Sequence, residues 1–377
     1  MRNREKIKKL TLEQKARLMS GKNMWETVDV PELEIPSIFF SDGPYGLRKQ
    51  VGATDHLGLN ASMPATSFPT SATIANSWDE KLIYEMGHRI GLESSYHDVD
   101  VLLGPGLNIK RNPKCGRNFE YFSEDPYLSG KMAAAYINGL QKTGTIASPK
   151  HLAVNSQETI RMSSNSIVDQ RTYHELYLTG FEIAVKESNP KAIMSSYNKI
   201  NGVYAHENSE LLKDILVDQW GFDGIVVSDW GGSNDHVESV RNGAHVAMPT
   251  VSLDGELEIV EAVLSGKLKE EVLNERVDEL LTVIFDKKKI EKVESLDYDE
   301  HSEFARKIAR ESAVLLKNEN SILPLDSVKS VAVIGDFAET PRYQGAGSSM
   351  VNPTKVDTTL NVIKDYPLNF VGYAKGF

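Results

Sequence analysis

The sequence predicts an α/β protein in which a (β/α)8 TIM-like barrel is followed by the beginning of a second α/β sandwich domain. Seven or so short apolar strands alternate with helices over about 250 residues, the size of such a barrel. Several of these strands end in charged residues. The competing fold, an open doubly wound sheet, would carry a glycine fingerprint at its first βα turn, and none is present.

The predicted strands are short runs rich in β-branched residues and bounded by turn residues. They lie at 35–42, 70–77, 99–109, 145–151, 192–197, 224–227 and 244–248. The predicted helices lie at 11–20, 78–97, 126–143, 170–187, 209–220 and 233–242, with further helical sequence from 254 to 289. Thr11 suits a helix cap, and Pro126 suits a first helical turn.

We expect the barrel to span residues 1–289 and a polar linker to span 290–300. After a helix over 301–317, the strand 330–336 begins the second domain, which occupies 301–377. The glycine-rich loop at 345–349 lacks the lysine and the spacing of a phosphate-binding loop. Because a domain under about 60 to 80 residues is marginal alone, we expect the second domain to be incomplete and the chain to be a fragment or part of a cut chain.

Composition and charge exclude some classes of function. The chain is 40% hydrophobic and 25% charged, which is typical of a soluble globular protein. Its formal net charge of −11, with no basic stripe, argues against a nucleic-acid partner. The single cysteine, Cys115, excludes an internal disulfide and fits a reducing compartment. With no secretory signal and no long apolar run, we expect a cytoplasmic protein without a membrane span.

The stretch from Gly221 to Gly232 carries the strongest candidate for catalysis. Its apolar run ends in Ser228, Asp229 and Trp230, and a helical pattern follows. Asp229 therefore lies at the C-terminal end of a strand, where barrels of this type carry catalytic groups. An aspartate in that place can also simply cap the next helix or fill the turn, and both interpretations stay open.

Other predicted strand ends and their loops also carry polar side chains: Asp42, Arg48, Arg117, Glu120, Lys150, His151 and Tyr197. A barrel would bring them to one rim. Carboxylates and guanidinium groups bind hydroxyls through charge-assisted hydrogen bonds, and Tyr197 and Trp230 can stack on a sugar. The pattern therefore favours a neutral ligand rich in hydroxyl groups.

Each of these residues also has a structural explanation. Asp42 precedes Gly-Pro and could be a turn former, Arg117 and Glu120 could form a surface ion pair, and the Lys150-His151 pair could be solvated. No HxE, HExxH or CxxC spacing predicts a metal site, and no GxSxG predicts a serine nucleophile. We therefore predict neither a metal nor a cofactor.

Five motifs together resemble glycoside hydrolase family 3, of the β-glucosidase type. They are SDGPYGLR (41–48), GRNFEYFSEDP (116–126), KHLAVNSQE (150–158), SDWGG (228–232) and ESAVLLKNENSILPL (311–325). They occur in the order and with the spacing of the family, and they cover nearly the whole chain.

The resemblance implies a role for each candidate. Asp229 matches the nucleophile, and Asp42 matches an acid that binds sugar hydroxyls in the −1 subsite, with Arg48 in the same motif. The remaining matches are Arg117 as a sugar-binding arginine with Glu120 beside it, Lys150 and His151 as the pair that holds the glycone, Tyr197 as the aromatic residue beside the nucleophile, and Met194 and Trp230 as pocket walls.

The implied reaction is retaining hydrolysis of terminal non-reducing β-D-glucosyl residues through a covalent glycosyl-Asp229 intermediate. In the β-glucosidase type the acid/base is a glutamate on the second domain or beyond, so we expect it outside these 377 residues. Neither Glu120 nor Glu158 is assigned that role. The β-N-acetylhexosaminidase branch uses a histidine in a KHFPGHG-like motif, whereas KHLAVNSQE has no second histidine.

Two other functions stay open: a sugar-binding pseudoenzyme or fragment that lacks the acid/base, and the β-N-acetylhexosaminidase branch. The expected partner is a small β-glucoside or oligosaccharide, together with a C-terminal remainder of the same protein. A homo-oligomer is left open, and the sequence specifies neither the glycone, the aglycone nor the linkage.

Overall fold

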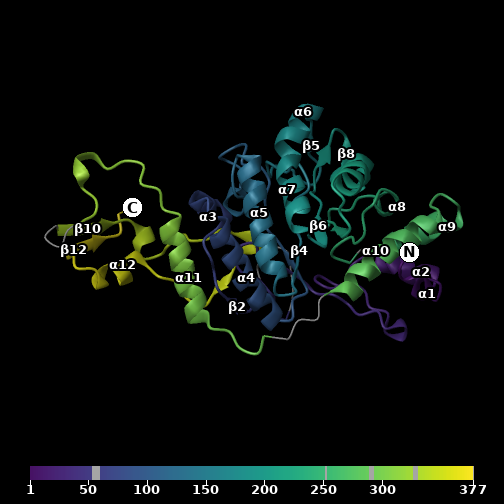
Figure 1. The fold of residues 1–377 in the computed structure, drawn as a ribbon, viewed down its shortest axis with the longest axis horizontal. Helices are drawn as coiled ribbons and strands as arrows, with labels where there is room; N and C mark the ends of the chain where they lie inside the picture. Colours follow the sequence, from purple (N-terminus) through teal and green to yellow (C-terminus); the bar gives the residue numbers. More distant parts are fainter. Residues whose placement is uncertain (53–59, 251–252, 288–292, 326–329, 377) are drawn as a thin grey trace.

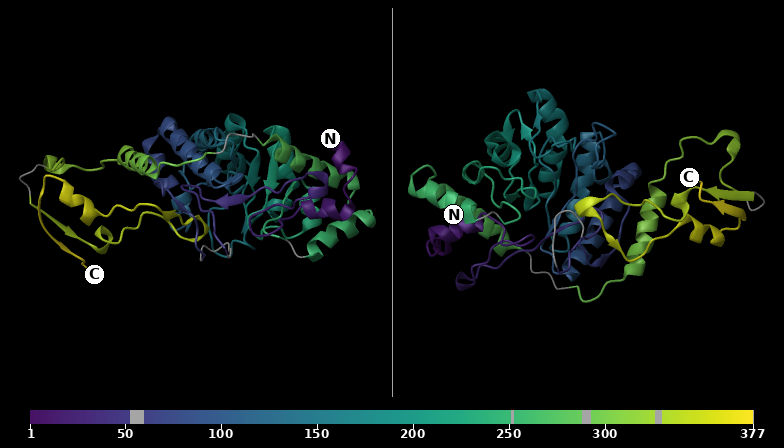
Figure 2. Two further views of the ribbon diagram at one scale, coloured as in Figure 1. Left: turned by 90° about the horizontal axis from the view of Figure 1, so that it is seen from below. Right: turned by 180° about the vertical axis from the view of Figure 1, so that it is seen from behind.

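The computed structural model of this chain describes residues 1–52, 60–250, 253–287, 293–325 and 330–376. Figure 1 shows an elongated molecule with a large body that holds the N-terminus and a small lobe that holds the C-terminus. Helix α11 (Tyr298–Glu311) lies between the two. The two further views in Figure 2 show the same extended outline.

The strands of the body are short, parallel and buried. One sheet has the order β1 (Phe40–Asp42), β3 (Val101–Leu103) and β4 (Ile146–Ala147), and a second pairs β6 (Ala192–Met194) with β9 (Ile225–Val227). Parallel bridges continue these sheets from Leu152 to Ser195 and from Val227 to Val246. All residues of these strands are buried, as expected when helices cover a parallel sheet.

Glycines let the covering helices approach one another closely. Helix α4 (Glu80–Tyr96) packs against α5 (Pro126–Gln141), and α5 packs against α7 (Thr179–Ser188). A Cβ at Gly139 would lie 2.0 Å from the carbonyl oxygen of Tyr84, and one at Gly87 would lie 2.3 Å from that of Tyr136. Any larger residue there would separate α4 from α5.

The remaining helices cover the outside of the body. They are α1 (Arg4–Ile7), α2 (Leu12–Leu18), α6 (Gln170–Thr172), α8 (His236–Arg241), α9 (Leu253–Leu264) and α10 (Glu270–Asp286), with π-helical segments at Tyr173–Leu178 and Glu210–Gln219. Thr11 caps α2 as expected, since its side chain accepts a hydrogen bond from the Gln14 N–H. No helix in the described parts of the chain is long and apolar enough to cross a membrane.

Two strand predictions were wrong. Residues 70–77 form α3 (Ser71–Ile74) followed by a 3₁₀ turn, because the Thr70 carbonyl accepts local hydrogen bonds from Thr73 and Ile74 and the segment buries Ile74 and Ala75. β-Branched residues alone do not determine a strand. The predicted strand 244–248 is reduced to single bridges at Val246 and Ala247.

The smaller strands lie outside the buried sheets. β5 (Asn165–Ser166), β7 (Lys199–Ile200) and β8 (Val203–Tyr204) form a three-stranded sheet. Its strands are exposed or half-buried except at Ile200, so this sheet belongs to the surface.

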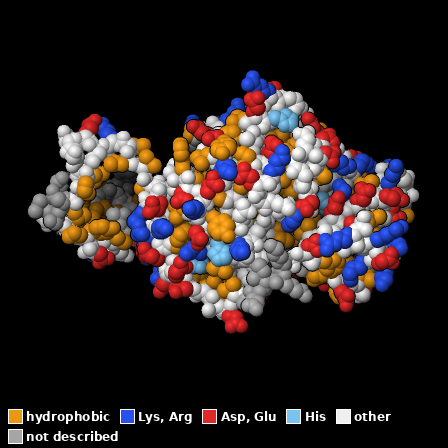
Figure 3. Space-filling model, in the orientation of Figure 1, with side chains coloured by type: hydrophobic (Ala, Val, Ile, Leu, Met, Phe, Trp, Pro, Cys, Tyr) orange, Lys and Arg blue, Asp and Glu red, His pale blue; other side chains and the backbone are white. Residues whose placement is uncertain are grey.

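The C-terminal lobe pairs β10 (Ser330–Ile334) in parallel with β12 (Asn369–Ala374), beside α12 (Thr359–Val362). Helix α11 starts at Tyr298, inside the predicted linker, because Asp297 caps it, and it ends at Glu311 rather than at 317. Residues 288–292 of the predicted boundary lie outside the described residues. Many hydrophobic side chains of the lobe are exposed (Figure 3). Leu316 and Ile334 are among them.

Residues 343–354, here called the return loop, leave the lobe and come back to the body. Its strand β11 (Asn352–Pro353) pairs in parallel with β2 (Pro64–Ala65). Asn352 donates to the Ser62 carbonyl at 2.9 Å, and the Thr354 N–H donates to Ala65 at 3.0 Å. This pairing carries residues 345–349 to the ends of the buried strands.

Candidate active site

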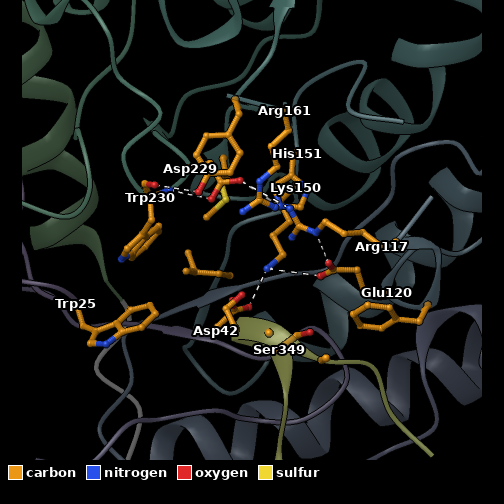
Figure 4. Close-up of a pocket in the computed structure, with 18 residues that line it drawn as sticks. Trp25, Asp42, Arg117, Glu120, Lys150, His151, Arg161, Asp229, Trp230 and Ser349 are labelled. Atoms are coloured by element: carbon orange, nitrogen blue, oxygen red, sulfur yellow. Dashed lines mark hydrogen bonds and ion pairs between the residues drawn. The ribbon is translucent and has the colours of Figure 1, made fainter. Parts of the chain in front are cut away.

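A cavity of about 220 Å³ lies at the C-terminal ends of the buried strands, and the return loop forms part of its wall (Figure 4). It is smaller than the roughly 300–1,000 Å³ of pockets for drug-sized ligands, so it fits one small ring. Its lining residues are Trp25, Asp42, Leu103, Gly116, Arg117, Phe119, Glu120, Lys150, His151, Arg161, Met194, Tyr197, Asp229, Trp230 and residues 346–349.

Asp229 follows β9 and lines the cavity. Its Oδ1 accepts a hydrogen bond from the Trp230 N–H at 2.8 Å. Its Oδ2 has no hydrogen-bond partner among the described residues, and it lies 3.9 Å from Arg117 Nη1 and 3.6 Å from His151 Nε2. The backbone therefore fixes one oxygen, while the other lies between two nitrogen-bearing side chains without a hydrogen bond.

The turn that carries Asp229 is held from two sides. Gly231 adopts φ of 83°, a left-handed conformation that favours glycine, and its N–H donates to the Met248 carbonyl at 2.6 Å. The Tyr197 hydroxyl donates to the Trp230 carbonyl at 2.9 Å. These bonds orient the Asp229 carboxylate.

Arg117 and Glu120 form a buried ion pair in the wall of the cavity. Arg117 Nε donates to Glu120 Oε1 at 2.5 Å, and the two side chains are 13% and 2% exposed. Burial works against the charge of Arg117, but Glu120 and other nearby acidic groups raise the pKa of Arg117 well above its usual value. The pair is therefore not the solvated surface pair that was one sequence interpretation.

Lys150 and Asp42 form a second buried pair, although 108 positions separate them. Lys150 Nζ donates to Asp42 Oδ1 at 2.8 Å, with the side chains 2% and 6% exposed. Burial raises the pKa of Asp42, but the charge and hydrogen bond of Lys150 outweigh burial and hold this pKa below its ordinary value. Asp42 therefore carries a charge against the cavity.

His151 is fully buried and neutral. Burial, with the positive charges of Arg117 and Lys150, lowers the pKa of His151 well below its usual value. Its Nδ1 lies 3.1 Å from the Tyr121 hydroxyl, and its backbone N–H donates to Asn108 at 2.7 Å. A neutral imidazole so fixed can exchange hydrogen bonds with a sugar hydroxyl.

The opposite wall is aromatic. The rings of Trp25 and Trp230 pack with their centroids 5.1 Å apart and their planes tilted by 40°. Trp25 Nε1 donates to Gln50, and Trp230 Nε1 donates to the Met24 carbonyl, both within 2.9 Å. A charged arc that faces aromatic rings suits a ligand with hydroxyl groups and an apolar C–H face.

Arg48 is the one sequence candidate that the structure does not bring to the cavity. It is 2% exposed, and its guanidinium donates to the carbonyl oxygens of Ser348 and Asn60 at 3.2 and 3.4 Å. Arg48 thus contacts the return loop. The other nine candidates, Asp42, Arg117, Glu120, Lys150, His151, Met194, Tyr197, Asp229 and Trp230, all line the cavity.

Sequence reasoning missed several lining residues. Arg161 follows the KHLAVNSQE motif, and its guanidinium stacks over the Tyr197 ring, 4.6 Å from the centroid. Trp25 precedes the first strand and lies in none of the motifs. Ser348 and Ser349 come from the return loop, which the sequence suggested only as a poor phosphate-binding loop. The one available signal was the position of Arg161 just after a motif.

The return loop fits tightly against the body. A Cβ at Gly345 would lie 2.3 to 2.5 Å from three atoms of the Phe119 ring. The Tyr45 hydroxyl lies 3.5 Å from Ser349 Oγ. Residues far apart in sequence thus complete one cavity.

Within the described residues, no group of three or more His, Cys, Asp or Glu side chains is placed to hold a metal ion. The donors around the cavity are paired carboxylates and cations, which suit a polar organic ligand. The fold and the site together define an α/β protein with a sugar-sized cavity at the ends of its parallel strands.

The chain belongs to glycosyl hydrolase family 3. Residues 3–283 match the family's N-terminal domain, and residues 313–369 match its C-terminal domain. The resemblance predicted from the five motifs is confirmed.

Two relatives illustrate the similarity. The chain is 49% identical over 359 residues to the thermostable β-glucosidase B of Acetivibrio thermocellus, covering 95% of this chain and 48% of that protein. It is 42% identical over 386 residues to an exo-α-(1→6)-L-arabinopyranosidase of Bifidobacterium longum, covering 98% and 50%. The chain therefore spans about half the length of these relatives.

Solved structures agree with the family. β-Glucosidase 3B from Thermotoga neapolitana, in complex with glucose, superimposes with a TM-score of 0.91 at 38% identity, covering 98% of this chain and 55% of that one. A family 3 β-glucosidase of Bifidobacterium adolescentis gives a TM-score of 0.87 at 41% identity, with coverage of 98% and 53%.

Proposed function

We propose that this chain carries the glycone site and the nucleophile of a retaining β-glycosidase that hydrolyses terminal non-reducing β-D-glucosyl residues. The observation that carries the proposal is the position of Asp229 in the wall of a sugar-sized cavity, where the backbone holds its Oδ1 and its Oδ2 has no hydrogen-bond partner among the described residues. The β-glucosidase names of its relatives support the same class of reaction.

The reaction has two displacement steps. In the first, Asp229 Oδ2 forms a bond to the anomeric carbon, the bond from that carbon to the leaving oxygen breaks, and a carboxylic acid protonates the leaving oxygen. In the second, the resulting carboxylate takes a proton from water, the water oxygen bonds to the anomeric carbon, and Asp229 leaves. The two carboxyl groups would lie about 5–5.5 Å apart.

The charged residues of the cavity are proposed to bind the sugar hydroxyls. Asp42 and Glu120 present carboxylates and Arg117 presents N–H groups. Lys150, which bonds Asp42, and the neutral His151 lie beside them and would contact the glycone. Met194, Tyr197 and Trp230, with the newly found Trp25 and Arg161, would form the remaining wall.

The acid/base is proposed to come from polypeptide outside these 377 residues, such as a C-terminal remainder of the protein. The body, residues 1–289, is proposed to be a (β/α)8-type barrel, and 290–300 would link it to a sandwich domain that begins at 301. The parallel contacts from β1 through β3, β4, β6 and β9 to Val246, and from Ala247 to Ser20, support a barrel.

The glycone and the setting are narrower proposals. We favour a small β-glucoside or oligosaccharide over an N-acetylhexosaminide, since the motif lacks the second histidine. Because one relative is named an α-L-arabinopyranosidase, an α-L-arabinopyranoside belongs in the substrate panel.

A cytoplasmic location is proposed and would be contradicted by recovery of the protein from the culture medium. Size-exclusion chromatography would decide whether the protein is a homo-oligomer.

The test is the intact mass of the protein after incubation with a 2-deoxy-2-fluoro-β-D-glucoside that carries a very good leaving group. Such a substrate needs little acid assistance. We expect one covalent adduct on the parent protein and none on Asp229→Asn. No adduct on the parent, under conditions where glucose binds, would support a sugar-binding pseudoenzyme instead.

A further inference from the structure

Glu158 lies behind the cavity wall and contacts a lining residue, although it does not itself line the cavity. Its Oε2 accepts a hydrogen bond from Arg161 Nη1 at 2.9 Å, and the side chains are 21% and 34% exposed. Its Oε1 is buried without a hydrogen-bond partner among the described residues. A half-buried carboxylate with one free oxygen costs free energy, so this placement calls for a functional reason.

A continuous series of contacts leads from Glu158 to Asp229. Glu158 bonds Arg161, and the Arg161 guanidinium stacks on the Tyr197 ring, 4.6 Å from its centroid. The Tyr197 hydroxyl donates to the Trp230 carbonyl at 2.9 Å, and the Trp230 N–H donates to Asp229 Oδ1 at 2.8 Å. Arg161 and Asp229 lie on the same side of the cavity, opposite Asp42 (Figure 4).

Glu158 also completes the charge pattern of this wall. Two guanidinium groups face the cavity, and each has its own carboxylate: Arg117 has Glu120, and Arg161 has Glu158. Without Glu158, the wall beside the nucleophile would gain one uncompensated positive charge. An arginine without its carboxylate partner also loses the hydrogen bond that fixes the orientation of its planar guanidinium group.

We propose that Glu158 is a positioning residue that acts through Arg161, holding this guanidinium against Tyr197 and so orienting the sugar and the Asp229 turn. The inference rests on the proposed glycosidase function. It assigns to Glu158 no proton transfer, because Glu158 does not line the cavity.

The charge of Glu158 gives this role a pH signature. The groups that face it are Arg117, Arg161, Glu120 and, at the periphery, Tyr121 and Cys115. Burial raises the pKa of Glu158, and the two arginines only partly oppose burial. As the pH falls through this raised pKa, Glu158 is protonated and its ion pair with Arg161 is lost.

Three variants test the proposal in the protein as expressed from its own gene. Glu158→Ala removes the charge and the hydrogen bond, and we expect kcat/KM for 4-nitrophenyl β-D-glucoside to fall about 10- to 100-fold, the cost of a small displacement. Glu158→Gln keeps an acceptor for Arg161, so we expect a smaller loss and an acid limb of kcat/KM displaced to lower pH. Glu175→Ala, which breaks an exposed pair with Arg171, is the matched control and should match the parent.

A double-mutant cycle separates positioning from general stability. In the Arg161→Ala background, Glu158→Ala should cost less than threefold. An equal loss in both backgrounds, or parent-like activity and an unmoved acid limb in both Glu158 variants, would overturn the proposal. Should Glu158→Ala fail to fold, Glu158→Gln and its acid limb decide.

Glucose binding, followed by the fluorescence of Trp25 and Trp230, keeps this test separate from that of the proposed function. If the protein hydrolysed none of the glycosides in the panel, the proposed glycosidase function would be contradicted. In that case, a Kd for glucose raised about tenfold by Glu158→Ala, and left unchanged by Glu175→Ala, would still support the positioning role. An unchanged Kd would reject it.

Discussion

The guanidinium of Arg117 lies 3.9 Å from Oδ2 of Asp229, while its Nε is bonded to Glu120 at 2.5 Å. One planar cation therefore faces the candidate nucleophile and a fixed carboxylate at the same time. A lysine could supply the charge, but its single ammonium group could not donate in a fixed geometry toward both Glu120 and Asp229.

Replacing Arg117 by lysine should separate charge from geometry. We expect Arg117→Lys to lower kcat/KM for 4-nitrophenyl β-D-glucoside by about 10²-fold, because the planar guanidinium group that fixes the cation between Glu120 and Asp229 is lost. Arg171→Lys, at an arginine that is 82% exposed, is the control and should stay within about twofold. Retention of half the parent activity by Arg117→Lys would contradict this role.

The Lys150–Asp42 pair should be costly to break on one side only. Lys150→Met leaves the Asp42 carboxylate buried and unpaired, and we expect the free energy of unfolding in urea to fall by about 3–5 kcal/mol. The double variant Lys150→Met, Asp42→Leu should recover at least half of that loss, since no uncompensated charge remains. Lys191→Met, which breaks an exposed pair with Asp223, should cost less than about 1 kcal/mol.

The contact between Gly345 and Phe119 should couple the return loop to the cavity. A methyl group at Gly345 would overlap the Phe119 ring, so Gly345→Ala should displace Ser348 and Ser349 and raise the Kd for glucose about tenfold. Phe119→Leu removes the overlapping ring atoms and should partly restore binding in the double variant. Unchanged glucose binding by Gly345→Ala would show that the loop does not contribute to the site.

His206 should make the protein less stable in acid. It is fully buried beside Ser195 Oγ at 2.8 Å, and burial lowers its pKa to about 3. The unfolded chain takes up this proton near pH 6.5 and the folded chain does not, so the free energy of unfolding falls by about 1.4 kcal/mol per pH unit as the pH decreases below 6.5.

The measurement is urea unfolding at pH 6, 5 and 4. Asparagine does not titrate, so we expect the free energy of unfolding of His206→Asn to depend less steeply on pH, by about 1.4 kcal/mol per pH unit. His174→Asn, at an exposed histidine, should keep the parent slope. Equal slopes for the parent and His206→Asn would refute the assignment.

Much of the site could be predicted from local sequence. Asp42 ends β1, Asp229 follows β9, and Lys150 and His151 follow β4; each of these strands is a short apolar run of the kind that predicts a strand from local sequence. The five motifs also identified the family. Local pattern failed at residues 70–77, where threonines suggested a strand but local hydrogen bonds and burial of Ile74 favoured a helix.

The sequence by itself determined the family, the α/β class and nine of the residues around the cavity. Only the tertiary structure decided that Arg48 contacts the return loop, and that Trp25, Arg161 and Ser348 complete the wall. The physical reason is distance along the chain. Pairing of β2 with β11, and packing of Gly345 on Phe119, bring together residues more than 200 positions apart, and no local periodicity records such a contact.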